Sequence, residues 1–246
     1  MIKQLPNTIT SLNLLCGCVA IFFAVSGDLV TASFFMIFGI FFDFFDGLAA
    51  RVLNAQSEVG LELDSLADVI TSGVAPAIVM VQLLSKATTG NYLIISEVFT
   101  VSGGSSTFSN FFPFVGLLIA VASAYRLAKF NVDTRQTTSF IGLPTPANTL
   151  LIISLPLILH FQYSEFAESI ILNKWLLLGL TIVSCMLLNS EIRLFGLKYK
   201  TWDFHKNIIR YVYLILSVIL LIWLHFIAIP IVIVLYVLMS LFWKGS

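Results

Sequence analysis

The chain is made mostly of long apolar segments separated by short polar ones. A helix needs about 20 apolar residues to cross the hydrocarbon core of a bilayer, and eight segments approach or reach that length. The predicted spans are residues 8–26, 30–50, 66–86, 111–130, 145–162, 174–190, 209–226 and 228–243. The pattern therefore predicts an all-α polytopic membrane protein. The last two spans are expected to form a tight hairpin around Pro230.

The composition supports a membrane-embedded chain. Of the 246 residues, 59% are hydrophobic and 11% are charged, and the mean hydropathy is +0.99. A soluble domain carries about 25% charged residues, so the composition excludes an ordinary soluble fold. Thirteen basic and 13 acidic residues give a net charge of zero. Nucleic acid is not an expected partner, because its binding needs a basic face.

The basic residues are distributed unevenly between the two ends of the predicted spans. Lys and Arg accumulate in cytoplasmic loops. With a cytoplasmic N-terminus, all the basic residues except Lys86 and Lys174 fall on or near the cytoplasmic side: Lys3, Arg51, Arg126, Lys129, Arg135, Arg193, Lys198, Lys200, Lys206, Arg210 and Lys244. Both termini are therefore expected on the cytoplasmic side of the inner (cytoplasmic) cell membrane. Residues 191–208 mix basic and aromatic side chains. This composition fits either a segment at the membrane surface or an ordinary cytoplasmic loop.

Four aspartates lie in, or at the edge of, the second and third predicted spans. Asp43 and Asp46 are three residues apart and Asp64 and Asp68 are four apart, so each pair shares one helical face. A carboxylate at the centre of a membrane helix costs about 2.5–3.5 kcal/mol, and less near the interface. The polar linker 52–60 allows the two spans to form an antiparallel hairpin with these faces opposed. The four carboxylates are then expected to converge near the cytoplasmic interface.

Carboxylates held this close repel one another unless a cation lies between them. An all-oxygen ligand set suits Mg²⁺, Mn²⁺ or Ca²⁺ better than zinc. Two such ions can clamp the attacking and leaving oxygens of a phosphoryl transfer. A cation transporter is an alternative interpretation, in which the aspartates line an ion path. The clustering at one interface and the lack of unwound mid-membrane helices disfavour it.

The spacing of these residues resembles the signature of the CDP-alcohol phosphotransferase family. The matching pattern is Asp43-x-x-Asp46-Gly47-x-x-Ala50-Arg51, eight further residues, and then Gly60-x-x-x-Asp64-x-x-x-Asp68. The resemblance implies a six-helix catalytic core, usually in a homodimer. It also implies a divalent-metal-dependent transfer of a substituted phosphate from a CDP-linked donor to an alcohol, with release of CMP. We accordingly expect a core over residues 1–190, a cytoplasmic loop over 191–208 and a transmembrane hairpin over 209–246.

The resemblance also implies roles for individual residues. Two Mg²⁺ or Mn²⁺ ions would be held by Asp43, Asp46, Asp64 and Asp68, and Asp68 would in addition be the general base. The donor, CDP-diacylglycerol, would contact Gly47, Arg51 and Ser57 together with Asn7, Thr10 and Asn13 near the start of the chain.

Residues 124–132 and 140–148 resemble the bacterial and archaeal branch of the family in which the acceptor is L-serine. Serine is a zwitterion, so its pocket needs a cation for the carboxylate and polar groups around it. The candidates for the carboxylate are Arg126, Lys129 and Arg135, and the candidates for the ammonium group are Asn131, Asp133 and Asn148. The basic residues could instead reach out to lipid headgroups as snorkelling side chains. Glycerol 3-phosphate or inositol phosphate are alternative acceptors, although their dianionic phosphate calls for more basic residues.

Overall fold

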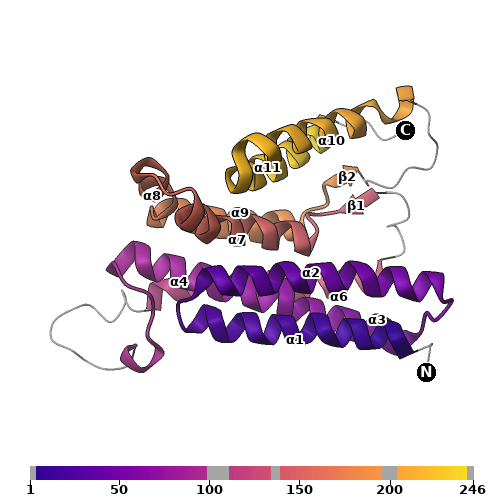
Figure 1. The fold of residues 1–246 in the computed structure, drawn as a ribbon, viewed down its shortest axis with the longest axis horizontal. Coiled ribbons are helices and arrows are strands. Elements are labelled where there is room, and N and C mark those ends of the chain that lie inside the picture. Colours follow the sequence, from indigo (N-terminus) through magenta and orange to yellow (C-terminus); the bar gives the residue numbers. More distant parts are fainter. Residues whose placement is uncertain (1–3, 99–110, 134–138, 196–203, 243–246) are drawn as a thin grey trace.

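A computed structural model of the chain describes residues 4–98, 111–133, 139–195 and 204–242 (Figure 1). The α-helices are α1 (Leu5–Val25), α2 (Leu29–Val52), α3 (Glu58–Asp68), α4 (Ala75–Thr89), α6 (Leu118–Val132), α7 (Thr145–Phe161), α8 (Glu165–Ile171), α9 (Lys174–Asn189), α10 (Phe204–Leu224) and α11 (Ala228–Phe242). Shorter helical turns are η2 (Val69–Val74), η3 (Ile95–Glu97), η4 (Phe112–Leu117) and η5 (His225–Ile227). Two short strands, β1 (Ser139–Ile141) and β2 (Arg193–Phe195), complete the fold.

The helices lie roughly along one long axis in three layers (Figure 1). Helices α1 to α6 form the lowest layer in that view, α7 and α9 the middle one, and α10 and α11 the uppermost one. The start of α1, the end of α2 and helix α3 lie together at one end of the bundle, called the aspartate end below. The prediction of an all-α polytopic membrane protein is confirmed, with one small β-ribbon added.

The number of spans depends on how two segments are counted. Among the described residues, five helical segments are long and apolar enough to cross a membrane, or six if α8 and α9, bent by 56°, count as one. All eight predicted segments are helical, but α7 is shorter than a full span, with 17 residues. The apolar stretch Ile208–Leu241 counts as a single segment by length and composition.

That last stretch nevertheless folds back on itself. The rings of Tyr213 in α10 and Tyr236 in α11 have centroids 5.5 Å apart, whereas a continuous helix would separate these residues by roughly 34 Å. The reversal is at η5, where His225 has a φ of 46°. The predicted turn at Pro230 was therefore wrong. Pro230 lies in the first turn of α11, where a missing N–H costs no helical hydrogen bond.

The third predicted span begins earlier than its hydropathy suggested. Helix α3 begins at Glu58 and continues through η2 into α4, so the linker after α2 covers only residues 53–57. Ser57 caps α3, because its Oγ accepts a hydrogen bond of 3.0 Å from the Gly60 N–H. The predicted linker 52–60 was too long because this cap starts a helix within a polar segment.

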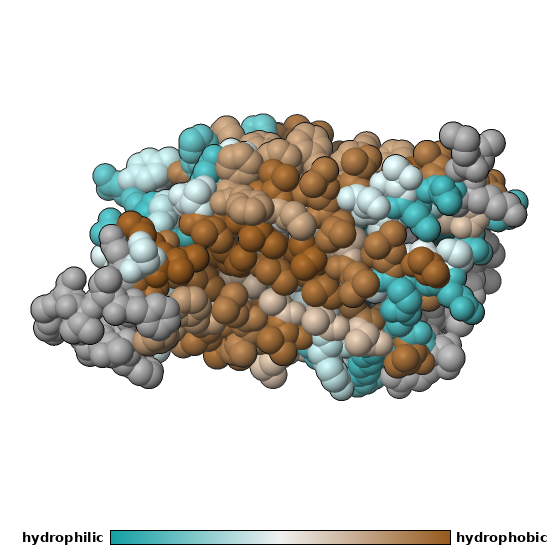
Figure 2. Space-filling model, turned by 90° about the horizontal axis from the view of Figure 1, so that it is seen from below, coloured by the Kyte–Doolittle hydropathy of each residue, from teal (hydrophilic) through white to brown (hydrophobic). Residues whose placement is uncertain are grey.

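Helix α1 packs with its small and polar residues inward. Its buried residues are Pro6, Thr10, Asn13, Gly17, Ala20 and Ala24. Large apolar side chains such as Leu15 and Phe22 are exposed. Small inward residues let membrane helices approach closely, and the large ones face lipid. Figure 2 shows the resulting apolar belt across the middle of one face, with hydrophilic residues towards both ends.

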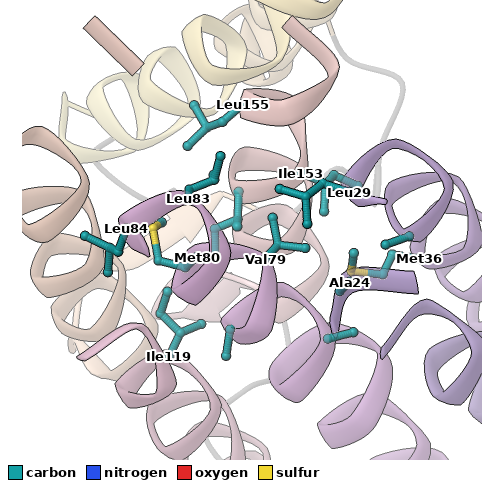
Figure 3. Close-up of a cluster of buried hydrophobic side chains, with 14 of the residues drawn as sticks. Ala24, Leu29, Met36, Val79, Met80, Leu83, Leu84, Ile119, Ile153 and Leu155 are labelled. Carbon is teal, nitrogen blue, oxygen red and sulfur yellow. The ribbon is translucent and has the colours of Figure 1, made fainter. Parts of the chain in front are cut away.

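The main hydrophobic core is built around α4. Val79, Met80, Leu83 and Leu84 of that helix are fully buried, and Figure 3 shows them beside residues of α1, α2, α6 and α7. Because α4 contacts all four of these helices, the core fixes the third span in the centre of the bundle.

A π-helical segment, η2, follows directly after Asp68. Its residue Thr71 is fully buried and donates a 3.1 Å hydrogen bond to the Asn13 carbonyl. A Cβ atom at Gly17 would lie 2.3 Å from Thr71 Oγ1, and one at Gly39 would lie 2.4 Å from Thr71 Cγ2. Thr71 therefore fills a space that exists because α1 and α2 both have glycine there. Such π segments often occur at functional sites.

Strands β1 and β2 form an antiparallel ribbon at the aspartate end. Ser139 pairs with Phe195 and Ile141 pairs with Arg193. The predicted loop 191–208 is therefore a strand over Arg193–Phe195 and helical from Phe204 onward. Its middle part, residues 196–203, lies outside the described residues.

Candidate active site

Three of the four aspartates converge at the aspartate end. Asp43 comes from α2, and Asp64 and Asp68 come from α3. One carboxylate oxygen of each lies within 4.8 Å of those of the other two. Asp46 follows one turn later on α2 and is buried, but it does not belong to this group of three. It lies instead at the wall of an adjacent cavity that Asp64 also lines.

These carboxylates fit a hard divalent cation. The group of three offers only oxygen ligands, which Mg²⁺ and Mn²⁺ prefer. Two buried carboxylate oxygens at the site, Asp46 Oδ2 and Asp64 Oδ1, have no hydrogen-bond partner among the described residues. Buried polar atoms are almost always bonded, so unpaired carboxylate oxygens next to an acidic cluster are the donors that a cation would use.

A cavity of about 510 Å³ opens beside the aspartates. Its lining comes from α1, from the second half of α2, from the linker 53–57 and from α3: Pro6, Asn7, Thr10, Asp46, Gly47, Ala50, Arg51, Ala55, Gln56, Ser57, Glu58, Gly60, Leu61 and Asp64. Five of the six residues predicted to contact the donor, namely Asn7, Thr10, Gly47, Arg51 and Ser57, belong to this lining. The cavity therefore combines backbone-exposing glycine, hydroxyl groups and one guanidinium next to the acidic cluster.

The two glycines of the signature serve different purposes. A Cβ atom at Gly47 would have Arg51 Nη2 as its nearest neighbour, at 3.4 Å, so Gly47 opens the helix surface towards the cavity. A Cβ atom at Gly60 would lie 3.0 Å from Asn7 Oδ1, so Gly60 lets α1 approach α3. Arg51 is exposed, and its Nε donates to the Gly47 carbonyl at 3.0 Å.

Asn13, the sixth predicted donor residue, has a different position. It is fully buried, and its Nδ2 donates a 3.3 Å hydrogen bond to Asp68 Oδ1. It is thus a neighbour of the acidic group and not part of the cavity lining. Together with the Thr71 contact to its backbone, this bond links the position of Asp68 to α1.

Arg126 is a predicted acceptor residue that interacts with the acidic group. It lies on α6, is only 7% exposed, and interacts electrostatically with Asp68. Its guanidinium carbon lies 5.9 Å from the centre of the Phe130 ring. The Nε atom is buried without a hydrogen-bond partner among the described residues. A buried cation with an open donor suits an anionic group better than a headgroup at the surface.

The other predicted acceptor residues are engaged elsewhere or not described. Lys129 forms an ion pair with Glu191. Asn131 Nδ2 donates a hydrogen bond of 2.9 Å to the Oγ of Ser65, the residue that follows Asp64 in the sequence. Arg135 lies outside the described residues. The arrangement therefore favours Arg126 over Lys129, Asn131 and Arg135 as an acceptor contact.

One buried polar residue near this region was predicted as a candidate partner for the serine ammonium group. Asn148 on α7 is fully buried, and neither its Oδ1 nor its Nδ2 has a partner among the described residues. Its neighbour Thr149 donates to the Ser72 carbonyl in η2 at 3.0 Å, which links α7 to the π-helical segment. A polar side chain in an apolar helix was the available signal, but its burial depends on contacts between distant segments.

Comparison with known proteins agrees with this geometry. The sequence profile of the CDP-alcohol phosphatidyltransferase family matches residues 3–187. The chain belongs to this family. The matched region contains all four aspartates and the whole cavity lining, and it ends within α9, before the hairpin of α10 and α11. The resemblance read from the signature is thereby confirmed.

Several curated members of the family are similar to the chain. CDP-diacylglycerol–serine O-phosphatidyltransferase of Bacillus subtilis is 34% identical over 172 residues, covering 68% of this chain and 81% of that protein. The protein of the same name from Helicobacter pylori J99 is 31% identical over 211 residues, covering 85% and 79%. Archaetidylserine synthase of Methanothermobacter thermautotrophicus is 32% identical over 170 residues, covering 68% and 63%.

The acidic group predicts a measurable cation site. In protein stripped with EDTA, Mn²⁺ affinity followed by electron paramagnetic resonance should fall at least about tenfold in Asp64→Asn, since losing even a residue that only supports a metal ligand typically costs 10–100-fold. Glu62→Gln removes the same charge from an exposed position of the same helix and should leave the affinity within about twofold. An equal loss in both variants would mean that the ion responds only to overall charge.

Proposed function

We propose that this protein transfers the phosphatidyl group of CDP-diacylglycerol to the hydroxyl group of L-serine, giving phosphatidylserine and CMP. The proposal is supported most directly by the acidic group itself, in which Asp64 lines the cavity of the signature residues and Asp68 interacts with the buried Arg126. Donor and acceptor would approach the same carboxylates from opposite sides. The names of the similar family members point to the same donor and acceptor.

The cavity residues would hold the CDP part of the donor. Gly47 lets the nucleotide approach the backbone of α2, and the Arg51 guanidinium suits a phosphate oxygen. Asn7, Thr10 and Ser57 offer polar groups around it. Mg²⁺ or Mn²⁺, in our proposal two ions held by Asp43, Asp46, Asp64 and Asp68, would neutralise the pyrophosphate charge and stabilise the leaving CMP.

The acceptor would lie between Asp68 and Arg126. Arg126 would bind the serine carboxylate and so orient the hydroxyl group. Asp68 would take the hydroxyl proton while the serine oxygen bonds to the phosphorus that carries diacylglycerol and the bond to CMP breaks. The hydrogen bond from Asn13 would hold Asp68 in one orientation for this step.

The arrangement in the membrane is part of the same proposal. We propose that the aspartate end faces the cytoplasm. Most basic residues lie at the ends of the predicted spans that are assigned to the cytoplasmic side. Residues 1–190 would form the catalytic core, followed by the cytoplasmic segment 191–208 and the hairpin 209–246. A homodimer stays a prediction from the family resemblance.

The direct test is an acceptor screen. Purified protein in detergent with CDP-diacylglycerol and Mg²⁺ or Mn²⁺ should release CMP when L-serine is added, and EDTA should abolish the release. Glycerol 3-phosphate, inositol phosphate and water alone are the comparison acceptors. CMP release that follows one of these and not serine would replace the proposed acceptor. Full turnover in excess EDTA would contradict the metal-dependent mechanism.

Arg126→Ala should raise the KM for serine without a comparable rise in the KM for CDP-diacylglycerol. Loss of a charge-assisted hydrogen bond costs about 1.5–3 kcal/mol, or roughly 10- to 150-fold in affinity. Lys86→Ala is the matched control, because Lys86 lies at the other end of the bundle, beside Tyr92. Steady-state kinetics in both substrates provide the measurement. An unchanged serine KM would leave Arg126 as a snorkelling or structural residue.

Asp68→Asn and Asp43→Asn should fail in different ways. Both keep the size of the side chain and remove one charge, but only Asp68 is assigned to proton removal. Asp43→Asn should weaken metal-dependent donor binding. Asp68→Asn should largely retain it and lower kcat by about 10²–10⁴-fold, as loss of a general base does. Donor binding and kcat are measured separately at saturating metal. If both variants lose donor binding equally, Asp68 is only a ligand.

A further inference from the structure

The C-terminal hairpin has a hydrophobic core of its own, separate from the one around α4. Its buried members come from α7 and the residues just before it, from β2 and from the hairpin: Leu143, Leu151, Leu194, Phe195, Tyr213, Ile233 and Tyr236. Phe195 of β2 is fully buried in the middle of it. The hairpin lies beyond the part of the chain that matches the family profile, residues 3–187. The second core therefore joins this additional hairpin to the family core through the ribbon.

Tyr236 connects α11 to β2. Its hydroxyl group donates a 2.9 Å hydrogen bond to the Phe195 carbonyl, and its ring meets the Phe195 ring edge to face with centroids 5.0 Å apart. Tyr213 of α10 packs against the same two rings, at 5.6 Å from Phe195 and 5.5 Å from Tyr236. A buried hydroxyl–carbonyl bond within an aromatic cluster fixes direction as well as contact.

The ribbon carries this connection towards the proposed acceptor site. Phe195 pairs with Ser139 in β1, two residues before Ile141. Ile141 lines a small pocket together with Arg126, Lys129 and Phe130 of α6. The pairing continues beyond Ile141 and Arg193, because the Gly142 N–H donates a hydrogen bond of 3.0 Å to the Ile192 carbonyl.

Two further contacts bring the hairpin and the ribbon to the same place. Lys129 of α6 pairs with Glu191, two residues before β2. Tyr236 and Arg126 are near enough to interact electrostatically. The contacts therefore run from the hairpin through β2 and β1 to the pocket around Arg126.

We propose that Tyr236 is a positioning residue for the acceptor: through its bond to the Phe195 carbonyl it holds the β1–β2 ribbon as a wall against Arg126. The inference rests on the proposed function, since it takes Arg126 as the group that binds the serine carboxylate. Tyr236 touches neither the acidic group nor the donor cavity. Its effect should therefore appear in acceptor binding and not in donor binding.

The test is Tyr236→Phe, which keeps the ring and removes the hydroxyl group. The KM for serine should rise about 3- to 10-fold, the range expected for one net hydrogen bond, while the KM for CDP-diacylglycerol and Mn²⁺ affinity stay at the wild-type level. Tyr213→Phe is the matched control. It removes a hydroxyl group from the same cluster, leaves the bond from Tyr236 to Phe195 in place, and should change neither KM.

Hydrogen exchange provides a readout that does not depend on activity. Backbone amides in residues 139–143 and 192–195 should exchange faster in Tyr236→Phe than in wild type or Tyr213→Phe, with the amides of α4 unchanged. Unchanged exchange in the ribbon would overturn the inference even if the variant were less active. A rise in both KM values together with faster exchange in α4 would also overturn the inference, because the hydroxyl group would then support the whole fold.

The kinetic outcomes also separate this inference from the proposed function. Wild-type protein that releases no CMP with serine would overturn the proposed function and the inference with it. Wild-type protein that is active with serine, combined with an unchanged serine KM in Tyr236→Phe, would overturn the inference alone.

Discussion

The structure depends on holding four carboxylates at the end of an apolar helix bundle. Each costs free energy to remove from water, and at the short distances between Asp43, Asp64 and Asp68 they also repel one another. Only the surrounding helices can keep them together before a cation binds. The bond from Asn13 and the charge on Arg126 both act on Asp68, and neither residue lines the donor cavity. The site is thus prepared for a divalent ion by groups that offset only part of the negative charge.

Close helix packing provides the rigidity that such a cluster requires. Gly17 and Gly39 allow Thr71 to lie between α1 and α2, one turn beyond Asp68. Thr149 of α7 bonds to the same π-helical segment. Helices α1, α2, α6 and α7 therefore all contact η2, and a shift of any one of them would move Asp68 relative to Asp43. In a membrane, where apolar side chains gain little by leaving lipid, this fit of small residues is a main source of helix association.

The sequence predicted the features that depend on local pattern. Hydropathy located the eight long apolar helical segments, and helical spacing brought the aspartates onto facing surfaces. It missed what depends on distant partners. The beginning of α3 followed from the Ser57 cap and not from hydropathy, and the turn at His225 is held by Gln162, whose Nε2 donates to the Leu224 carbonyl. Lys129 was predicted as an acceptor contact. Its ion pair with Glu191 could not be predicted, because Glu191 lies far away in the sequence.

The two cores suggest a division of tasks within one bundle. The core around α4 lies within the family-matched part of the chain and supports the helices that carry the aspartates and the donor cavity. The core around Phe195 joins the ribbon and the hairpin to α7 and α9. In our proposal for Tyr236, a change confined to the hairpin and the ribbon would alter the wall beside Arg126 while the packing of α2 and α4 in the first core stays as it is. A separation of this kind would allow the acceptor side to vary while the reacting phosphate stays in place.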